Sequence, residues 1–162
     1  MQISDRNYSL PFHDKTTRVA VITAMFNEKI TTALARSATA QLMQLGLKSE
    51  QILQLSVPGA WELPLAAQRI LAVKKADAVI ACGCVIRGET GHYDIVANES
   101  ARGLMAVSLE FSRPVMNAVL TVENTAQAEA RARDDETNKG AEAARSLAET
   151  MNGLVAAGLS HG

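Results

Sequence analysis

Residues 81–99 read A-C-G-C-V-I-R-G-E-T-G-H-Y-D-I-V-A-N-E. An apolar run over residues 78–86 ends at Arg87, a short glycine-containing polar loop follows, and apolar residues then recur along the next segment. The pattern predicts a buried strand, a tight loop and a helix. Ligands of open α/β sheets bind beyond the carboxyl ends of the strands, so a functional site is expected at the loop that carries His92.

The same alternation of apolar strand and helix recurs along the chain. Strands are predicted at residues 18–24, 52–57, 78–86 and 115–122. Helices are predicted from the capping residue Asn27 to Gly46, over residues 65–73, from about Asp94 to Ser112, from Asn124 to about Arg133, and along a last segment with Ala141, Ala144, Ala148, Met151 and Val155 on one face. Strands that are apolar on both sides and alternate with helices indicate a parallel sheet covered on both faces. We predict a flavodoxin-like, three-layer α/β/α fold with a four-stranded parallel sheet in the order 2-1-3-4.

The length of 162 residues fits a single domain. We expect this domain to span residues 18–162, after a polar N-terminal arm over residues 1–17 that is disordered or lies extended on another subunit. Hydrophobic residues make up 48% of the chain but aromatic residues only 4%, so the core must be built from Ala, Val, Ile and Leu.

Composition argues against several classes of protein. A net charge of -1 is unsuited to a nucleic-acid surface, which needs a concentration of Lys and Arg. No apolar run approaches the ~20 residues of a membrane span and no signal sequence is evident, so we expect a cytoplasmic protein without membrane contact. Cys82 and Cys84 fall on the same face of a predicted strand. We interpret them as core side chains rather than as a disulfide or metal pair.

Three predicted strand ends bring candidate functional residues to one edge of the sheet. They are Phe26, then residues 59–62, then residues 87–92. An aromatic ring, a carboxylate, free backbone N–H groups and an imidazole would suit a planar, polyhydroxylated ligand. Ordinary explanations also exist, since Phe26 could fill the core, Glu62 could face the positive end of a helix, and His92 could be solvated.

Arg131 and Lys139 flank a charged turn over residues 134–137. They could be solvated residues at helix ends, or they could bind an anion. Neither G-x-G-x-x-G nor a Walker sequence occurs, so the fingerprints of dinucleotide and nucleoside-triphosphate sites are absent from the sequence. Phosphate binding by residues 88–91 would therefore rest on backbone donors together with Arg131.

Five motifs, in order and spacing, resemble the lumazine synthase family of riboflavin biosynthesis. They are V-P-G-A-W-E-L-P (57–64), V-I-R-G-E-T-G-H-Y-D (85–94), V-A-N-E (96–99), V-L-T-V-E-N (119–124) and N-K-G-A-E-A-A (138–144). The resemblance extends over about residues 18–152. It implies a transferase-class condensing enzyme that joins 5-amino-6-(D-ribitylamino)uracil to 3,4-dihydroxy-2-butanone 4-phosphate, giving 6,7-dimethyl-8-ribityllumazine, phosphate and water. It also implies no metal or organic cofactor, and a homo-oligomer that is a pentamer or a multiple of it.

The resemblance further implies roles for individual residues. Phe26 would stack on the pyrimidine, and the ribityl chain would be held by Ala60, Trp61 and Glu62. The pyrimidine edge would be lined, mostly through backbone, by Cys84, Val85 and Ile86. The phosphorylated ketone would be bound by Glu89, Thr90 and Arg131, with Lys139 as an electrostatic helper. His92 would transfer protons, because ketone attack, loss of water and loss of phosphate each move a proton and histidine is the side chain that titrates near neutral pH.

The chain departs from the family pattern at three places. Met25 stands where many members have Arg, and Asn117 stands where many have Phe beside the pyrimidine. Asn117 is therefore a further candidate for a pyrimidine contact. The turn over residues 133–137 is charged where many members are rich in glycine, and in the family this turn bears on assembly. The number of pentamers in the assembly is thus left open.

Two other function classes remain as alternatives. One is a flavin- or lumazine-binding, or shell-forming, protein without catalysis, which the presence of His92 and Arg131 disfavours. The other is an aldolase-type enzyme with a Schiff base at Lys139, which is disfavoured because no apolar surroundings are evident around this lysine. A receiver domain of the same fold is disfavoured because the first strand ends T-A-M-F-N, without paired acidic residues.

Overall fold

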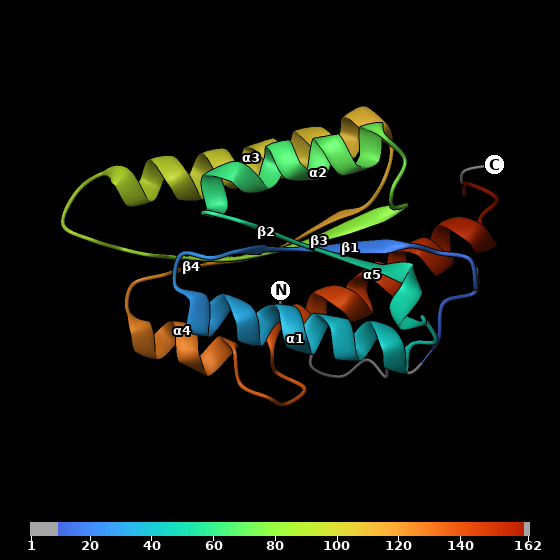
Figure 1. Ribbon diagram of the computed structural model, residues 1–162, viewed down its shortest axis with the longest axis horizontal. Coiled ribbons are helices and arrows are strands. Elements are labelled where there is room, and N and C mark those ends of the chain that lie inside the picture. Colours follow the sequence, from blue (N-terminus) through green and yellow to red (C-terminus); the bar gives the residue numbers. More distant parts are fainter. Residues whose placement is uncertain (1–9, 161–162) are drawn as a thin grey trace.

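Residues 10–160 are described by a computed structural model, and they form a parallel sheet between two layers of helices (Figure 1). The strands are β1 (Val19–Ala24), β2 (Ile52–Val57), β3 (Ala78–Ile86) and β4 (Val115–Val122). The helices are α1 (Glu28–Gln44), α2 (Leu63–Ala72), α3 (His92–Phe111), α4 (Thr125–Arg131) and α5 (Lys139–Ala156), with 3₁₀ turns η1 (Ser49–Gln51) and η2 (Ala60–Glu62). The described strands pair in the order β2-β1-β3-β4, all parallel, so the predicted fold class and strand order are confirmed.

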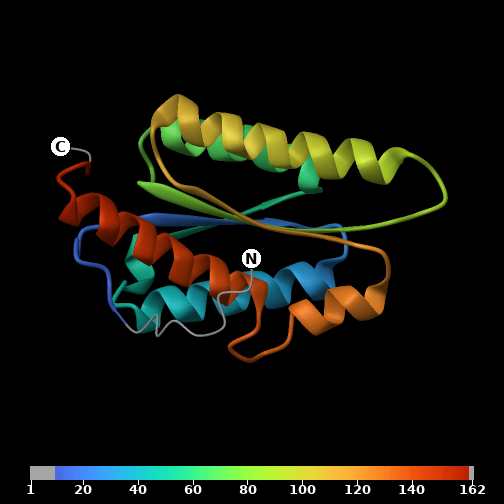
Figure 2. The ribbon, with the colours of Figure 1, turned by 180° about the vertical axis from the view of Figure 1, so that it is seen from behind.

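Helices α2 and α3 cover one face of the sheet, while α1, α4 and α5 cover the other (Figures 1 and 2). Each helical layer has its own apolar cluster against the sheet. β3 lies between β1 and β4, and its first seven residues are buried. Cys82 and Cys84 lie in the cluster under α1 and α5, as predicted. Burial raises the pKa of Cys82 to about 12 and that of Cys84 to about 11, so both thiols are neutral at pH 7.

β2 departs from the expectation that every strand is apolar on both sides. It is an edge strand of the described sheet, and residues 53–56 are exposed. Leu53 and Leu55 are each 40% exposed, and Gln54 and Ser56 alternate with them. The helical layers therefore cover the middle of the sheet more completely than this edge.

Residues 11–13 pack against this chain's own helices. Phe12 is buried, and its N–H donates to the carbonyl oxygen of Leu45 at 3.0 Å. Asn152 of α5 holds the segment from both sides, because its Nδ2 donates to Pro11 O at 2.9 Å and its Oδ1 accepts from His13 N–H at 2.8 Å. This differs from the expected disordered or exchanged arm, since a large aromatic side chain completes the core here. Residues 1–9 of that arm lie outside the described residues.

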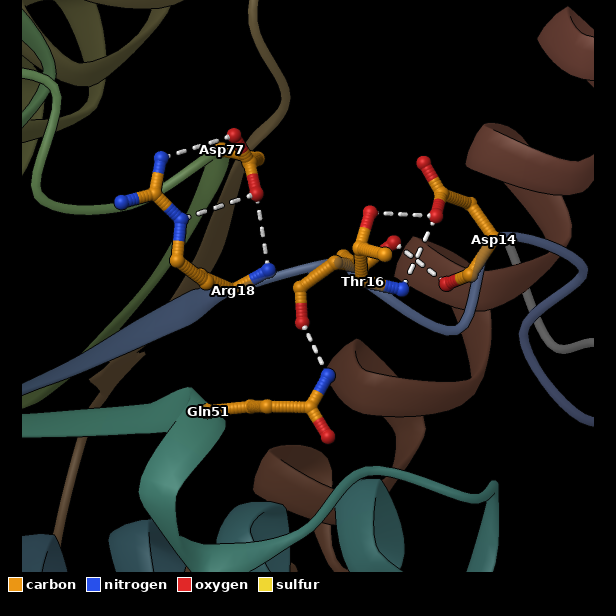
Figure 3. A network of polar contacts seen from close by, with 6 residues as sticks. Asp14, Thr16, Arg18, Gln51 and Asp77 are labelled. Carbon is orange, nitrogen blue, oxygen red and sulfur yellow. Dashed lines mark hydrogen bonds and ion pairs between the residues drawn. The ribbon is translucent and has the colours of Figure 1, made fainter.

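Polar contacts fix the start of β1 (Figure 3). Asp77, which precedes β3, accepts from the backbone N–H of Arg18 at 2.8 Å and pairs with its guanidinium at 3.3 Å. Gln51, which precedes β2, donates from Nε2 to two carbonyl oxygens of the segment before β1. Asp14 accepts from the hydroxyl and N–H of Thr16, and these bonds lower the pKa of Asp14. The amino ends of the three strands are thereby aligned.

Helix boundaries lie within about two residues of the predicted ones, with one difference in capping. Asn27 precedes α1 as predicted, but its backbone is left-handed (φ 61°, ψ 48°) and its side chain makes no capping hydrogen bond. The expectation of a side-chain cap at Asn27 is therefore wrong, because its amide is engaged elsewhere. Asn124 does cap α4, by accepting from Gln127 N–H at 2.9 Å. Among residues 10–160, none of the helices is long and apolar enough to cross a bilayer.

α1 and α5 cross at close range at Gly140. A Cβ atom at Gly140 would lie 2.0 Å from the carbonyl oxygen of Leu34 in α1. The fully buried Asn138 caps α5, because its Oδ1 accepts from Gly140 N–H at 2.8 Å while its Nδ2 donates to Arg133 O at 2.9 Å. Asn138 thus fixes the start of α5 and the charged turn before it, and Gly140 allows the close contact of α5 with α1.

Gly140→Ala should destabilise the protein, because the added methyl group would force α5 away from the backbone of α1. We expect a loss of about 2–3 kcal/mol in the free energy of unfolding, measured by urea denaturation. Gly153→Ala in the same helix is the matched control, since a Cβ atom there meets open space. It should be neutral or stabilising by up to about 1 kcal/mol. Equal effects of the two changes would contradict the close crossing.

Candidate active site

A cleft of about 690 Å³ lies at the carboxyl ends of β1, β2 and β3. We call it the strand-end cleft. Its lining residues are Phe26, Asn27, Pro58, Gly59, Ala60, Trp61, Glu62, Cys84, Val85, Ile86, Gly88, Thr90, His92, Tyr93, Ile95 and Val96. Parallel neighbours end at the same edge of a sheet, and this is why segments far apart in the sequence meet here. The cleft is the site expected from the strand ends.

The β1–α1 turn forms one wall of the strand-end cleft. Its backbone continues the sheet, because Met25 N–H donates to Val57 O at 2.8 Å and Phe26 N–H donates to Pro58 O at 2.9 Å. Phe26 is 74% exposed and Trp61 is 57% exposed, although both side chains are large and apolar. Exposed aromatic side chains lining one hollow are typical of a binding surface. The alternative that Phe26 fills the core is therefore excluded.

Glu62 is fixed at the second wall of the cleft by the turn that contains it. Its Oε2 accepts from the backbone N–H of Gly59 at 3.0 Å, across the 3₁₀ turn η2. α2 follows directly, with Pro64 in its first turn. The bond orients a carboxylate beside the exposed indole of Trp61, where it can accept hydrogen bonds from a polyhydroxylated chain.

Arg87 organises the loop that carries Thr90 and leads to His92 at the start of α3; this loop extends beyond the sheet between β3 and α3 (Figure 1). Its Nε lies 2.8 Å from Oε2 of Glu123 at the end of β4, and its Nη1 lies 3.5 Å from Oδ1 of Asp94. Its guanidinium carbon lies 4.2 Å from the ring centroid of Tyr93. The hydrogen bond to Glu123 raises the pKa of Arg87 further above its ordinary value. These contacts join the loop to the sheet and to the first turn of α3.

A second, smaller pocket of about 330 Å³ lies along β4, between α4 and α5. We call it the β4 pocket. It is lined by Met116, Asn117, Ala118, Val119, Leu120, Thr121, Val122, Arg131, Lys139, Glu142, Ala143 and Ser146. Lys139 Nζ pairs with Glu142 Oε2 at 2.9 Å, and Arg131 Nη1 donates to Gln127 O at 3.0 Å. Two cations, one of them neutralised by a carboxylate, give this pocket the chemistry of an anion site.

The residues predicted from sequence are thus divided between two places. Phe26, Ala60, Trp61, Glu62, Cys84, Val85, Ile86, Thr90 and His92 line the strand-end cleft. Asn117, Arg131 and Lys139 line the β4 pocket. Glu89 is exposed in the loop and lines neither. Sequence reasoning missed Asn27 and Tyr93 as cleft residues; the aromatic beside His92 was a signal for Tyr93, whereas Asn27 was interpreted only as a cap.

Comparison with known proteins identifies the family. The family model of 6,7-dimethyl-8-ribityllumazine synthase matches residues 16–154. The chain belongs to the lumazine synthase family. The 6,7-dimethyl-8-ribityllumazine synthase of Leptothrix cholodnii is 47% identical over 152 residues, which cover 94% of this chain and 96% of that protein. Those of Verminephrobacter eiseniae (44% over 142 residues; 88% and 90%) and Gemmatimonas aurantiaca (47% over 135 residues; 83% and 82%) are also similar.

The family that the sequence motifs predicted is therefore confirmed. The matched residues 16–154 include every motif on which that prediction rests. The motifs over residues 57–64 and 85–94 supply most of the lining of the strand-end cleft, and the motif over residues 138–144 supplies Lys139 of the β4 pocket. Within residues 10–160, the His, Cys, Asp and Glu side chains form no group of three or more that could hold a metal ion.

Arg87→Lys should loosen the loop, because an ammonium keeps the charge but cannot hold two carboxylates and a ring face with one planar fork. Amide hydrogen exchange of residues 88–92 should become roughly tenfold faster, with a stability loss below about 1 kcal/mol. Arg102→Lys is the matched control, since Arg102 pairs with Glu99 on α3, away from the loop. Unchanged exchange in Arg87→Lys would show that the loop is held by other contacts.

Proposed function

We propose that this protein condenses 5-amino-6-(D-ribitylamino)uracil with 3,4-dihydroxy-2-butanone 4-phosphate to form 6,7-dimethyl-8-ribityllumazine, releasing phosphate and water. Membership of the lumazine synthase family carries this proposal. The strand-end cleft supports it, because exposed aromatic side chains and an oriented carboxylate suit a planar ring with a polyhydroxylated chain. Lumazine absorbance on mixing both substrates with the protein is the direct test, and a protein that only binds flavin or lumazine would give none.

The pyrimidine substrate occupies the strand-end cleft. Phe26 stacks on the ring, and the turn Ala60–Glu62 holds the ribityl chain, with Glu62 accepting from its hydroxyl groups. Cys84, Val85 and Ile86 line the ring edge through their backbone. The Cys84 side chain is no nucleophile, because it is buried and its raised pKa keeps it a neutral thiol.

The phosphorylated ketone is bound by cations and by the β3–α3 loop. Arg131 has a planar fork of donors that matches a phosphate, and Lys139 adds a second positive charge in the same pocket. Glu89 and Thr90 contact the ketone from the loop, beside His92. The partial neutralisation of Lys139 by Glu142 leaves Arg131 as the main phosphate ligand.

The two substrates must touch, although the strand-end cleft and the β4 pocket share no lining residue. We infer that the enzyme is a homo-oligomer in which the β4 pocket of one subunit faces the strand-end cleft of the next. Asn117 then approaches the pyrimidine from the neighbouring subunit. Exposed apolar side chains at the cleft mouth and on the β2 edge support such a contact. Pentameric rings, alone or in multiples, are proposed by analogy with the family.

His92 acts as the proton-transfer group. The 5-amino group attacks the ketone, water leaves to give an imine, phosphate is expelled, and the ribitylamino nitrogen closes the ring on the second carbonyl with loss of a second water; each step moves a proton. His92 lies in the first turn of α3 and lines the cleft beside Thr90, whose Oγ1 accepts from His92 N–H at 3.3 Å. Imine formation from an amine is easy in water, so holding the substrates together supplies much of the acceleration.

We also propose that the enzyme works in the cytoplasm. Cys82 and Cys84 are both free and buried, a state typical of proteins in a reducing compartment.

His92→Ala should lower turnover by roughly 10- to 100-fold, measured by lumazine absorbance under saturating substrates. Binding of the ribitylaminouracil should survive, because Phe26, Trp61 and Glu62 remain in the cleft. His13→Ala is the control, since this exposed histidine uses its backbone N–H to contact Asn152, outside the cleft. Full turnover in His92→Ala would assign proton transfer to water or to another group.

Co-expression of His92→Ala with Arg131→Ala should give activity above that of either variant alone. If sites lie between subunits, an intact cleft from the Arg131→Ala subunit can face an intact β4 pocket from the His92→Ala subunit. Random mixing would leave about one quarter of the sites intact. Native mass spectrometry would show that mixed oligomers form. Mixed oligomers without recovery, or a fully active monomer, would contradict a shared site.

A further inference from the structure

β3 extends beyond the end of its pairing with β1, at the strand-end cleft. The last paired residues of these two strands are Thr23 and Cys82, whereas β3 stays paired with β4 as far as Ile86. In a parallel sheet, alternate residues direct their peptide groups to the same neighbour. Arg87 N–H donates toward β4, to Val122 O, so Cys84 and Ile86 direct theirs to the side that β1 has left. Peptide groups in this position need another partner.

Asn27 supplies that partner for Cys84. Its Nδ2 donates to the carbonyl oxygen of Cys84 at 2.9 Å, across 57 positions of sequence. The left-handed backbone of Asn27, which asparagine tolerates better than most residues, accompanies this contact. A residue at the start of a helix ordinarily turns its side chain back onto the first helical turn, but here the amide serves β3.

This single amide ties together walls of the cleft that come from different elements. The β1–α1 turn is already fixed to β2 by the N–H groups of Met25 and Phe26. The Asn27 side chain adds the connection from this turn to the end of β3. Phe26, which precedes Asn27, and the peptide groups of residues 84–86 are therefore held in a fixed relation.

We propose that Asn27 is a positioning residue of the reaction, which orients the β3 backbone and the Phe26 ring so that one ligand ring can be stacked and hydrogen-bonded at once. The inference rests on the proposed function, because it assigns the occupant of this wall to the ribitylaminouracil. Hydrogen bonds weaken steeply when the donor and acceptor are misaligned, so a β3 end that is free to tilt binds the ring edge poorly. The butanone phosphate, bound by the loop and by Arg131, does not depend on this orientation.

Asn27→Gly isolates the effect of the hydrogen bond to Cys84, because glycine keeps the left-handed backbone at no steric cost and removes only the side-chain amide. Asn27→Asp keeps the size of the side chain but places a carboxylate oxygen against the Cys84 carbonyl. Lys74→Gly is the matched control, since Lys74 also has a left-handed backbone (φ 58°) but follows α2 and lies outside the cleft. Thermal unfolding of all three variants checks that each is folded.

In Asn27→Gly, the Kd of the ribitylaminouracil alone, measured by calorimetry, should rise roughly five- to tenfold, the effect of one lost hydrogen bond. The KM of the ribitylaminouracil should rise in parallel, while the KM of the butanone phosphate should stay within about twofold of the parent's. Asn27→Asp should bind the ribitylaminouracil more weakly than Asn27→Gly does. Lys74→Gly should match the parent in the Kd and the KM of the ribitylaminouracil.

If folded Asn27→Gly or Asn27→Asp binds the ribitylaminouracil as tightly as the parent does, the inference is overturned. The proposed function still stands in that case, provided that the parent forms lumazine. Equal weakening for both substrates would indicate general distortion of the cleft and would overturn it too. A parent that binds the ribitylaminouracil but forms no lumazine would refute the proposed function, and the positioning role in the reaction would fall with it.

Discussion

The parallel pairing of β3 with β1 on one side and with β4 on the other sets both the core of the domain and the position of the candidate site. Because both neighbours are strands and both faces carry helices, the first seven residues of β3 are buried and must be small or apolar. The same pairing sets where each strand ends. β1 stops short of β3, so the end of β3 has β4 on one side and the cleft on the other. The candidate site is a consequence of this difference in strand length.

The cleft and the β4 pocket differ in how the fold builds them. Turns that follow three neighbouring strands converge to form the strand-end cleft, and two large aromatic side chains remain exposed at its mouth. The cations of the β4 pocket instead come from helix ends, and Lys139 is placed by the buried Asn138 and by the contact of Gly140 with α1. Packing inside the domain therefore determines the geometry of a surface that, in our proposal, serves a neighbouring subunit.

Much of the fold can be predicted from local sequence patterns. The bounds of β2, β3 and β4 agree with the predicted ones. For β3 the reason is that a buried strand requires apolar residues and turn residues end it. The order 2-1-3-4 follows from the few right-handed arrangements open to alternating strands and helices. The location of the cleft at the strand ends follows from the parallel sheet, because parallel neighbours end at the same edge. The motifs in residues 57–64 and 85–94 identify the family without any coordinates.

Patterns within short stretches of the sequence were enough to predict the elements, their order, the family and part of the cleft lining, but not Asn27 or Tyr93 as cleft residues. Only the tertiary structure decided that Phe26 is exposed, that Phe12 completes the core, and that Arg131 and Lys139 lie apart from His92. It also decided that Asn27 serves β3 rather than α1. These outcomes depend on which strand extends beyond its neighbour and on which helices are in contact, and such contacts join residues that are distant in sequence.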